Sequence, residues 1–109
     1  MRFKVLLTGQ ALLDMDDIIG YVRSNDSPAA AAALATHFEK VLGLLESFPQ
    51  RGNVVKELAS LGIKDFRESL YKPYRFIYRV TQKFVYVNLI ADGRRDMQSL
   101  LSRRILGSF

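Results

Sequence analysis

The chain contains 109 residues, enough for one domain spanning residues 1–109 and too few for a second. Hydrophobic residues make up 49% of the sequence and charged residues 25%, which is ordinary globular usage and excludes disordered, collagen-like and coiled-coil classes. There is no cysteine, and His37 is the only histidine. This excludes disulfide frameworks, cysteine-rich zinc sites and thiol nucleophiles.

The positive charge lies in the C-terminal part of the chain. The formal net charge is +5, from 16 lysines and arginines against 11 acidic residues. Residues 1–63 carry six basic and seven acidic side chains, whereas residues 64–109 carry ten basic and four acidic ones. We therefore expect a polyanionic or acidic partner, recognised by a surface that lies after residue 63.

No segment has the pattern of an export signal or a membrane span. The apolar run Val5–Leu7 is far shorter than the core of a signal peptide. The longest uncharged stretch, Ser27–Thr36, consists mainly of alanine and lacks the length and bulk to cross a bilayer. We expect a cytoplasmic protein with no membrane partner.

The first half of the chain predicts a strand followed by two helices. A short apolar and β-branched run opens the sequence, and two segments with apolar residues at three- and four-residue intervals follow it. The turn between these segments is short, so the two helices should form an antiparallel hairpin. The predicted boundaries are Phe3–Leu7 for the strand, Thr8 as cap of a helix that ends near Arg23, and Ser27 as cap of a helix that runs to about Ser47, before Pro49.

The second half predicts a meander of strands and a final helix. Two segments rich in aromatic and β-branched residues flank Thr81–Lys83, as in a β-hairpin. Two strands are not stable alone in water, so a third strand and the first one should pair beside them, with the helices covering one face. The predicted strands are Phe66–Tyr71, Arg75–Val80 and Phe84–Ile90, followed by a break at Asp92–Gly93 and an amphipathic helix bearing Met97, Leu100, Leu101 and Ile105. The fold class is α+β: an N-terminal strand, an antiparallel helical hairpin, an antiparallel β-meander and a C-terminal helix.

The strand Tyr74–Val80 carries the most suggestive basic residues. Alternation places Arg75, Ile77 and Arg79 on one face and the aromatic residues on the other. Two arginines beside aromatic rings are suited to phosphates and stacked bases. Alternatively, Arg75 and Arg79 solvate an exposed sheet face or pair with Glu68.

Catalysis by a nucleophile, a carboxylate pair or a metal is poorly supported. His37 has no catalytic motif around it, so a surface or packing role is the simpler interpretation. Asp14, Asp16 and Asp17 are close in sequence, but Asp14 and Asp16 diverge on a helix, and an acidic N-terminal turn that interacts with the helix dipole is the simpler explanation. The glycines are scattered and form no phosphate-binding loop. We expect no metal, no cofactor and no small-molecule substrate.

Five short motifs nevertheless occur together in a specific order and spacing. They are the early helix with Asp14, Asp17, Ile18 and Tyr21, "FPQRG" at Phe48–Gly52, "FRESLY" at Phe66–Tyr71, "YRFIYRV" at Tyr74–Val80 and "DGRRDM" at Asp92–Met97. As a set, covering almost the whole chain, they resemble the RelE/ParE superfamily of bacterial type II toxins.

One branch of this superfamily consists of RelE-like, ribosome-dependent mRNA endoribonucleases. The resemblance implies that Arg67, Arg75 and Arg95 would serve as its basic residues, stabilising charge at the phosphate. The branch also uses a tyrosine or histidine near the C-terminus for proton transfer, and Leu101 stands there in this chain. Because arginine is almost never deprotonated, it cannot replace that acid or base.

The other branch, ParE-like, inhibits DNA gyrase by binding to it and lacks the nuclease set. Its members resemble this chain at Gly93–Met97 and in the basic terminal helix, so we favour this function, with its associations with growth inhibition and plasmid stabilisation. The candidate target-binding residues, chosen by charge and position, are Arg94, Arg95, Arg103 and Arg104.

The resemblance also implies a cognate antitoxin, which would wrap an extended or helical acidic and hydrophobic segment over the helical hairpin and the sheet. The candidate antitoxin-binding residues are Met15, Ile19, Tyr21, Arg75 and Arg79. A third hypothesis is a basic domain that binds nucleic acid without toxicity, or a degenerate toxin.

Overall fold

Five strands form one sheet in the order β1-β5-β4-β3-β2 in the computed structural model, which describes residues 2–107. β1 pairs with β5 in parallel, and all other neighbours are antiparallel. The strands are β1 Lys4–Leu7, β2 Asn53–Val54, β3 Phe66–Tyr71, β4 Tyr74–Val80 and β5 Phe84–Asp92. The α+β fold class with its N-terminal strand and antiparallel meander is confirmed.

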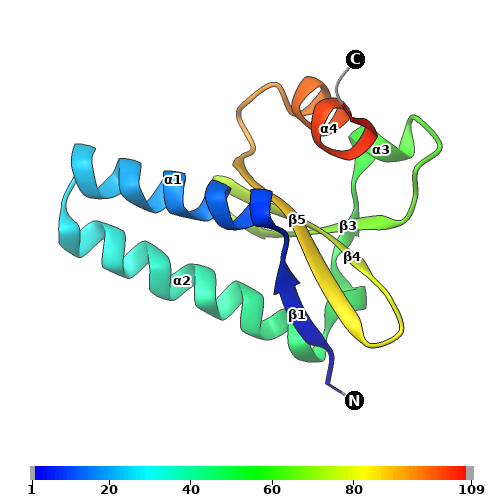
Figure 1. Cartoon of the computed structure of the whole chain (residues 1–109), viewed down its shortest axis with the longest axis horizontal. Coiled ribbons are helices and arrows are strands. Elements are labelled where there is room, and N and C mark those ends of the chain that lie inside the picture. Colours follow the sequence, from blue (N-terminus) through cyan, green and yellow to red (C-terminus); the bar gives the residue numbers. More distant parts are fainter. Residues whose placement is uncertain (1, 108–109) are drawn as a thin grey trace.

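The helical hairpin forms at the boundaries that its capping residues predict. Thr8 Oγ1 accepts the Ala11 N–H at 3.2 Å at the start of α1 (Gly9–Asn25). Ser27 Oγ accepts the Ala30 N–H at 3.0 Å at the start of α2 (Pro28–Ser47). Figure 1 shows the two helices side by side and antiparallel, against the sheet. No helix within residues 2–107 has the length and apolar character needed to span a bilayer.

Helices cover both faces of the sheet, which corrects the expectation that they cover one. Between β2 and β3 the chain forms a one-turn helix, α3 (Lys56–Ala59), which packs against α4 (Met97–Leu106). Figure 1 shows this pair apart from α1 and α2. The reason is that Ile77 of β4 and Leu89 and Ala91 of β5 form an apolar cluster on this second face, and that cluster needs its own cover.

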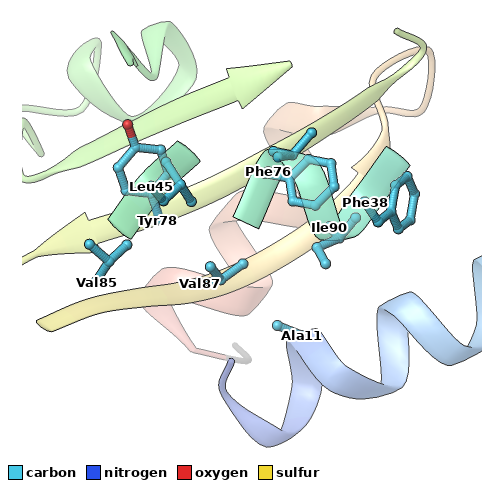
Figure 2. Close-up of a cluster of buried hydrophobic side chains, with 9 residues drawn as sticks. Ala11, Phe38, Leu45, Phe76, Tyr78, Val85, Val87 and Ile90 are labelled. Atoms are coloured by element: carbon cyan, nitrogen blue, oxygen red, sulfur yellow. The ribbon is translucent and has the colours of Figure 1, made fainter. Parts of the chain in front are cut away.

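Two hydrophobic cores therefore sandwich the sheet. The first lies under α1 and α2, where the Phe38 ring meets Phe76 edge-on at a centroid distance of 5.0 Å (Figure 2). Its buried members are Ala11, Phe38, Val41, Leu45, Phe76, Tyr78, Val85, Val87 and Ile90. The second lies under α3 and α4 and contains Val55, Leu58, Ile77, Leu89, Ala91, Met97, Leu100 and Leu101.

An irregularity in β5 lets one strand serve both cores. Tyr78 is opposite Val87, but the preceding residue, Ile77, is opposite Leu89, so Asn88 is an extra residue in β5. The bulge reverses the alternation along the strand. Val87 consequently faces the first core, whereas Leu89 faces the second.

The "FPQRG" segment is tied to the sheet by a buried tyrosine. The Tyr78 hydroxyl donates to the Pro49 carbonyl at 2.5 Å, and the pKa of this hydroxyl is raised by burial. A Cβ atom at Gly52 would lie 2.1 Å from the same hydroxyl and 2.6 Å from the Glu68 carbonyl oxygen. Only glycine allows the backbone to approach β3 and β4 this closely.

Gly52→Ala is expected to lower the free energy of unfolding by about 1–3 kcal/mol, because the added methyl group displaces Tyr78 from a packed site. The matched control is Gly43→Ala in α2, where a Cβ atom meets nothing within 4 Å. Removing a helical glycine there should raise stability by about 0.5–1 kcal/mol. Urea unfolding of both variants measures the difference, and equal stabilities would contradict the assigned role of Gly52.

Candidate functional site

The turn between β5 and α4 presents the first two candidate arginines. Arg94 is highly exposed, but its Nε donates to Asp92 Oδ1 at 3.0 Å and its Nη2 to Asp92 Oδ2 at 2.6 Å. The Arg94 N–H also donates to Asp92 Oδ1 at 2.9 Å. These bonds hold the pKa of the Asp92 carboxyl below its usual range, with the Arg94 side chain as the main cause. The turn is thus fixed in shape while Arg94 stays at the surface.

Both ends of this turn are anchored. The Gly93 N–H donates to the Pro73 carbonyl at 2.7 Å, and a Cβ atom at Gly93 would lie 2.8 Å from Arg75 Cδ. Asp96 caps α4, because its Oδ1 accepts the Ser99 N–H at 3.1 Å. That bond lowers the pKa of the Asp96 carboxyl. The "DGRRDM" motif therefore forms a strand-to-helix connection that is hydrogen-bonded at both ends.

A surface cavity of about 420 Å³ lies between α1 and this turn. It brings the target candidates Arg94 and Arg95 together with the antitoxin candidate Tyr21, whose side chain is 69% exposed. The remaining lining residues are Asp17, Ile18, Val22, Tyr74 and Asp92. Its two arginines are balanced by two aspartates, so the cavity is mixed in character and is not a strong anion site.

The two arginines of α4 differ in environment. Arg103 is exposed. Arg104 points inward: its Nη1 and Nη2 donate to the two carboxylate oxygens of Asp14, each at 3.0 Å. It also donates to the Asn88 carbonyl at 2.9 Å and to Gln10 Oε1 at 2.8 Å. This corrects the view of Arg104 as a surface contact, because these hydrogen bonds hold α4 to α1 and β5.

Arg75 is likewise used inside the protein. Its Nη1 and Nη2 donate to the Glu57 carboxylate at 2.7 and 2.8 Å, and its Nε donates to Glu68 at 2.5 Å. The side chain is only 12% exposed. Hydrogen bonding to Glu57 raises the pKa of Arg75, and the same bond lowers the pKa of Glu57. The pairing of Arg75 with Glu68 is confirmed, and Arg75 is not available as an antitoxin contact.

The three candidate nuclease arginines are not assembled into one site. Arg67 pairs with Tyr78 across β3 and β4 and so shares the side of the first core, where its Nη1 donates to the Gly52 carbonyl at 2.9 Å. Arg75 lies on the opposite side with Glu57. Leu101, at the position of the proton-transfer residue, is fully buried in the second core.

The remaining candidates divide into buried and exposed groups. Met15 and Ile19 pack against the first core, whereas Tyr21 and Arg79 are exposed. His37 stacks on Tyr71 at a centroid distance of 4.6 Å, in agreement with a packing role. Within residues 2–107 no three His, Cys, Asp or Glu side chains converge in a way that would hold a metal ion.

The sequence interpretation missed Glu57, Asp14 and Gln10 as partners of arginines. Glu57 and Arg75 are 18 residues apart, and Asp14 and Arg104 are 90 apart. In the sequence, only the opposite signs of the charges point to these ion pairs. Charge alone does not show which acidic residue an arginine contacts when the two are far apart in the chain.

Comparison with known proteins gives a consistent result. A family described as ParE toxin of type II toxin-antitoxin system, parDE, matches residues 5–97. No curated protein matches the chain in sequence. The chromosomal ParDE toxin-antitoxin system from P. aeruginosa aligns with a TM-score of 0.69 and 16% identity, over 84% of this chain and 96% of that one. The toxin-antitoxin complex RelBE2 from Mycobacterium tuberculosis aligns with a TM-score of 0.57 and 19% identity, over 84% and 99%. At these identities the solved structures show likeness of fold.

Arg104→Met is expected to lower the free energy of unfolding by about 3 kcal/mol, because it leaves the Asp14 carboxylate largely buried and unpaired. The matched control, Arg103→Met on the same helix, should change stability by less than about 0.5 kcal/mol. Adding Asp14→Asn to Arg104→Met removes the stranded charge and keeps an acceptor for the Ile90 N–H, so part of the loss should be recovered. Chemical denaturation measures the stability of the three variants. If the double variant recovered no stability, the loss in Arg104→Met would not be due to the unpaired Asp14 carboxylate.

The Glu57–Arg75 pair should make stability depend on acid. The pKa of Glu57 in the folded state is lowered from its ordinary value of 4.5. The ionised carboxylate therefore adds its full share to the free energy of unfolding above pH 4.5, and this share is lost as the pH falls through the folded-state pKa. Glu57→Gln should therefore be less stable than the parent at pH 7 and lose less stability on acidification. Urea midpoints between pH 7 and 3 test this, with Glu39→Gln, an exposed residue on α2, as the control that should follow the parent.

Proposed function

Because the chain belongs to the ParE toxin family of type II toxin-antitoxin systems, we propose that it inhibits DNA gyrase by binding to it, without catalysis. The proposal rests on the observation that the residues a RelE-like nuclease would need are not brought together at one site. Arg75 is ion-paired in the interior, Arg67 lies on the other side of the sheet, and a buried leucine occupies the proton-transfer position. Ribonuclease chemistry needs these groups together at one phosphate.

The proposed contacts with gyrase are Arg94, Arg95 and Arg103. Arg94 is presented by a turn that Asp92 and Gly93 hold rigid, so little ordering entropy is lost on binding there. Arg95 follows it at the rim of the cavity beside α1, and Arg103 is exposed on α4. Arg104 serves this surface indirectly, because it fixes α4 against β5.

We also propose that a cognate antitoxin neutralises the protein, in the cytoplasm. The fold is shared with chains from a ParDE toxin-antitoxin system and from a RelBE2 toxin-antitoxin complex. Of the candidate antitoxin contacts, Tyr21 and Arg79 are exposed. Met15 and Ile19 are half-buried against the first core, so only their outer edges are offered to a partner. Tyr21 borders the same cavity as Arg94 and Arg95, which would let an antitoxin there cover two target contacts.

Purified protein added to a DNA supercoiling reaction is expected to inhibit gyrase, and Arg95→Glu should raise the concentration needed by at least tenfold, roughly the 1.4 kcal/mol that one contact with a charged partner provides. Arg23→Glu, an exposed arginine on α1, is the matched control and should inhibit like the parent. Unimpaired supercoiling at a large molar excess would overturn the proposal.

Two further readouts separate the alternatives. Cleavage of mRNA on programmed ribosomes that is abolished by Arg95→Ala would favour the endoribonuclease. Unaffected growth on expression without an antitoxin would favour a basic binding domain or a degenerate toxin.

A further inference from the structure

We propose that the end of the sheet left uncovered by α3 and α4 binds single-stranded nucleic acid. The proposed surface, called the hairpin face, consists of Lys4, Leu6, Arg79, Phe84 and Tyr86. It contains none of the arginines proposed to contact gyrase and does not depend on that proposal.

The strand register places these five residues on one side of the sheet. Lys4 is opposite Phe84 and Leu6 is opposite Tyr86 in the β1–β5 ladder. Arg79 is opposite Tyr86 in the β4–β5 ladder. Residues directly opposite each other on paired strands point to the same side, so three neighbouring strands contribute to a continuous face.

This face is open to solvent. α3 and α4 cover the part of the same side that bears Ile77, Leu89 and Ala91, beyond the bulge. Lys4 and Arg79 are exposed, and the two rings are partly exposed. In Figure 1 the β4–β5 hairpin extends away from α3 and α4, so the terminal helix does not reach it.

The two rings form a platform for bases. The Phe84 and Tyr86 centroids are 5.8 Å apart and the planes are tilted by 33°, so neighbouring unstacked bases can each meet a ring. Lys4 and Arg79 lie on the strands on either side, two strand spacings apart across the sheet and two residues apart along it, so their Cα atoms are about 12 Å apart. They flank the rings where a bound backbone would carry its phosphates, and Lys83 is exposed in the adjoining turn.

The charge of the hairpin face favours a polyanion. None of its five residues is acidic, and within residues 2–107 neither Lys4 nor Arg79 has a carboxylate at ion-pair distance. Glu68, farther along the same side, is bonded to Arg75. The other arginines on β3 and β4 have structural partners, whereas Arg79 keeps its charge for a ligand.

A double helix hides its base faces from side chains on a flat sheet, whereas a single strand exposes them. The rings therefore select single strands, and the basic residues add affinity that depends on salt. The chemistry uses base faces and phosphates, which DNA and RNA share.

The test is fluorescence anisotropy of a labelled 15-nucleotide oligothymidylate, titrated with the full chain at low salt. Tyr86→Leu keeps an apolar side chain but removes the ring, and it should weaken binding at least about fivefold. Arg79→Gln should weaken binding and reduce the slope of log affinity against log salt by about 0.7. A matched aromatic–cation pair lies elsewhere, with Arg51 stacked 4.0 Å over the Phe48 ring. Phe48→Leu and Arg51→Gln should leave binding unchanged.

Three results would overturn the proposal. They are no binding of the oligonucleotide, equal affinity for a duplex of the same length, and equal losses in the Phe48 and Tyr86 variants. If a polyglutamate peptide bound with the same dependence on Tyr86 and the oligonucleotide did not, the face would be a protein-binding surface instead. Thermal melting of each variant identifies losses due to unfolding. Binding is measured without gyrase, so the result is independent of the proposed inhibition.

Discussion

The ion pair between Asp14 and Arg104 satisfies polar backbone groups of β5 at a place where the sheet provides no neighbouring strand. β1 pairs with β5 only as far as Val87, and α1 begins immediately afterwards, so β5 continues without a neighbour on that side. Asp14 accepts the Ile90 N–H, and Arg104 donates to the Asn88 carbonyl. The two side chains thus replace a missing strand and bond each other. Because one belongs to α1 and the other to α4, the same pair fixes both helical layers to the sheet.

Part of the positive charge in the C-terminal half of the chain is used for structure and is not free to bind a partner. Arg104 and Arg75 each neutralise carboxylates from another element, and Arg67 bonds a backbone carbonyl. These arginines hold elements of the fold together, because a largely buried guanidinium must find partners for its N–H groups. The arginines that we propose for recognition lie in two separate places, the turn and outer face of α4 and the uncovered end of the sheet. A single basic patch, as the charge distribution along the chain suggests, is not what the fold produces.

Local features of the fold could be predicted because their causes are local. Thr8, Ser27 and Pro28 mark helix starts through contacts within one turn, and both helix boundaries follow from them. The second core could not be predicted in the same way. Its cause is the extra residue Asn88, and a single polar residue within a mostly apolar strand does not by itself identify a bulge. The structural roles of Arg75 and Arg104 could not be predicted for a related reason. Their partners come from distant segments of the chain that lie near them only in the folded protein.

The motifs that carry the family resemblance are explained by packing. Gly52 admits the Tyr78 hydroxyl, Gly93 makes room for Arg75, and Asp96 caps α4. Substituting any of these would disturb the scaffold whatever the protein binds. These motifs therefore define the shared scaffold, and the proposed target depends in addition on side chains at the surface. Side chains that choose a target are those the scaffold leaves unoccupied, such as Arg95, Arg103 and the residues of the hairpin face. Two members of one family can differ at every such position and keep the same fold, so the target must be argued from these residues and tested there.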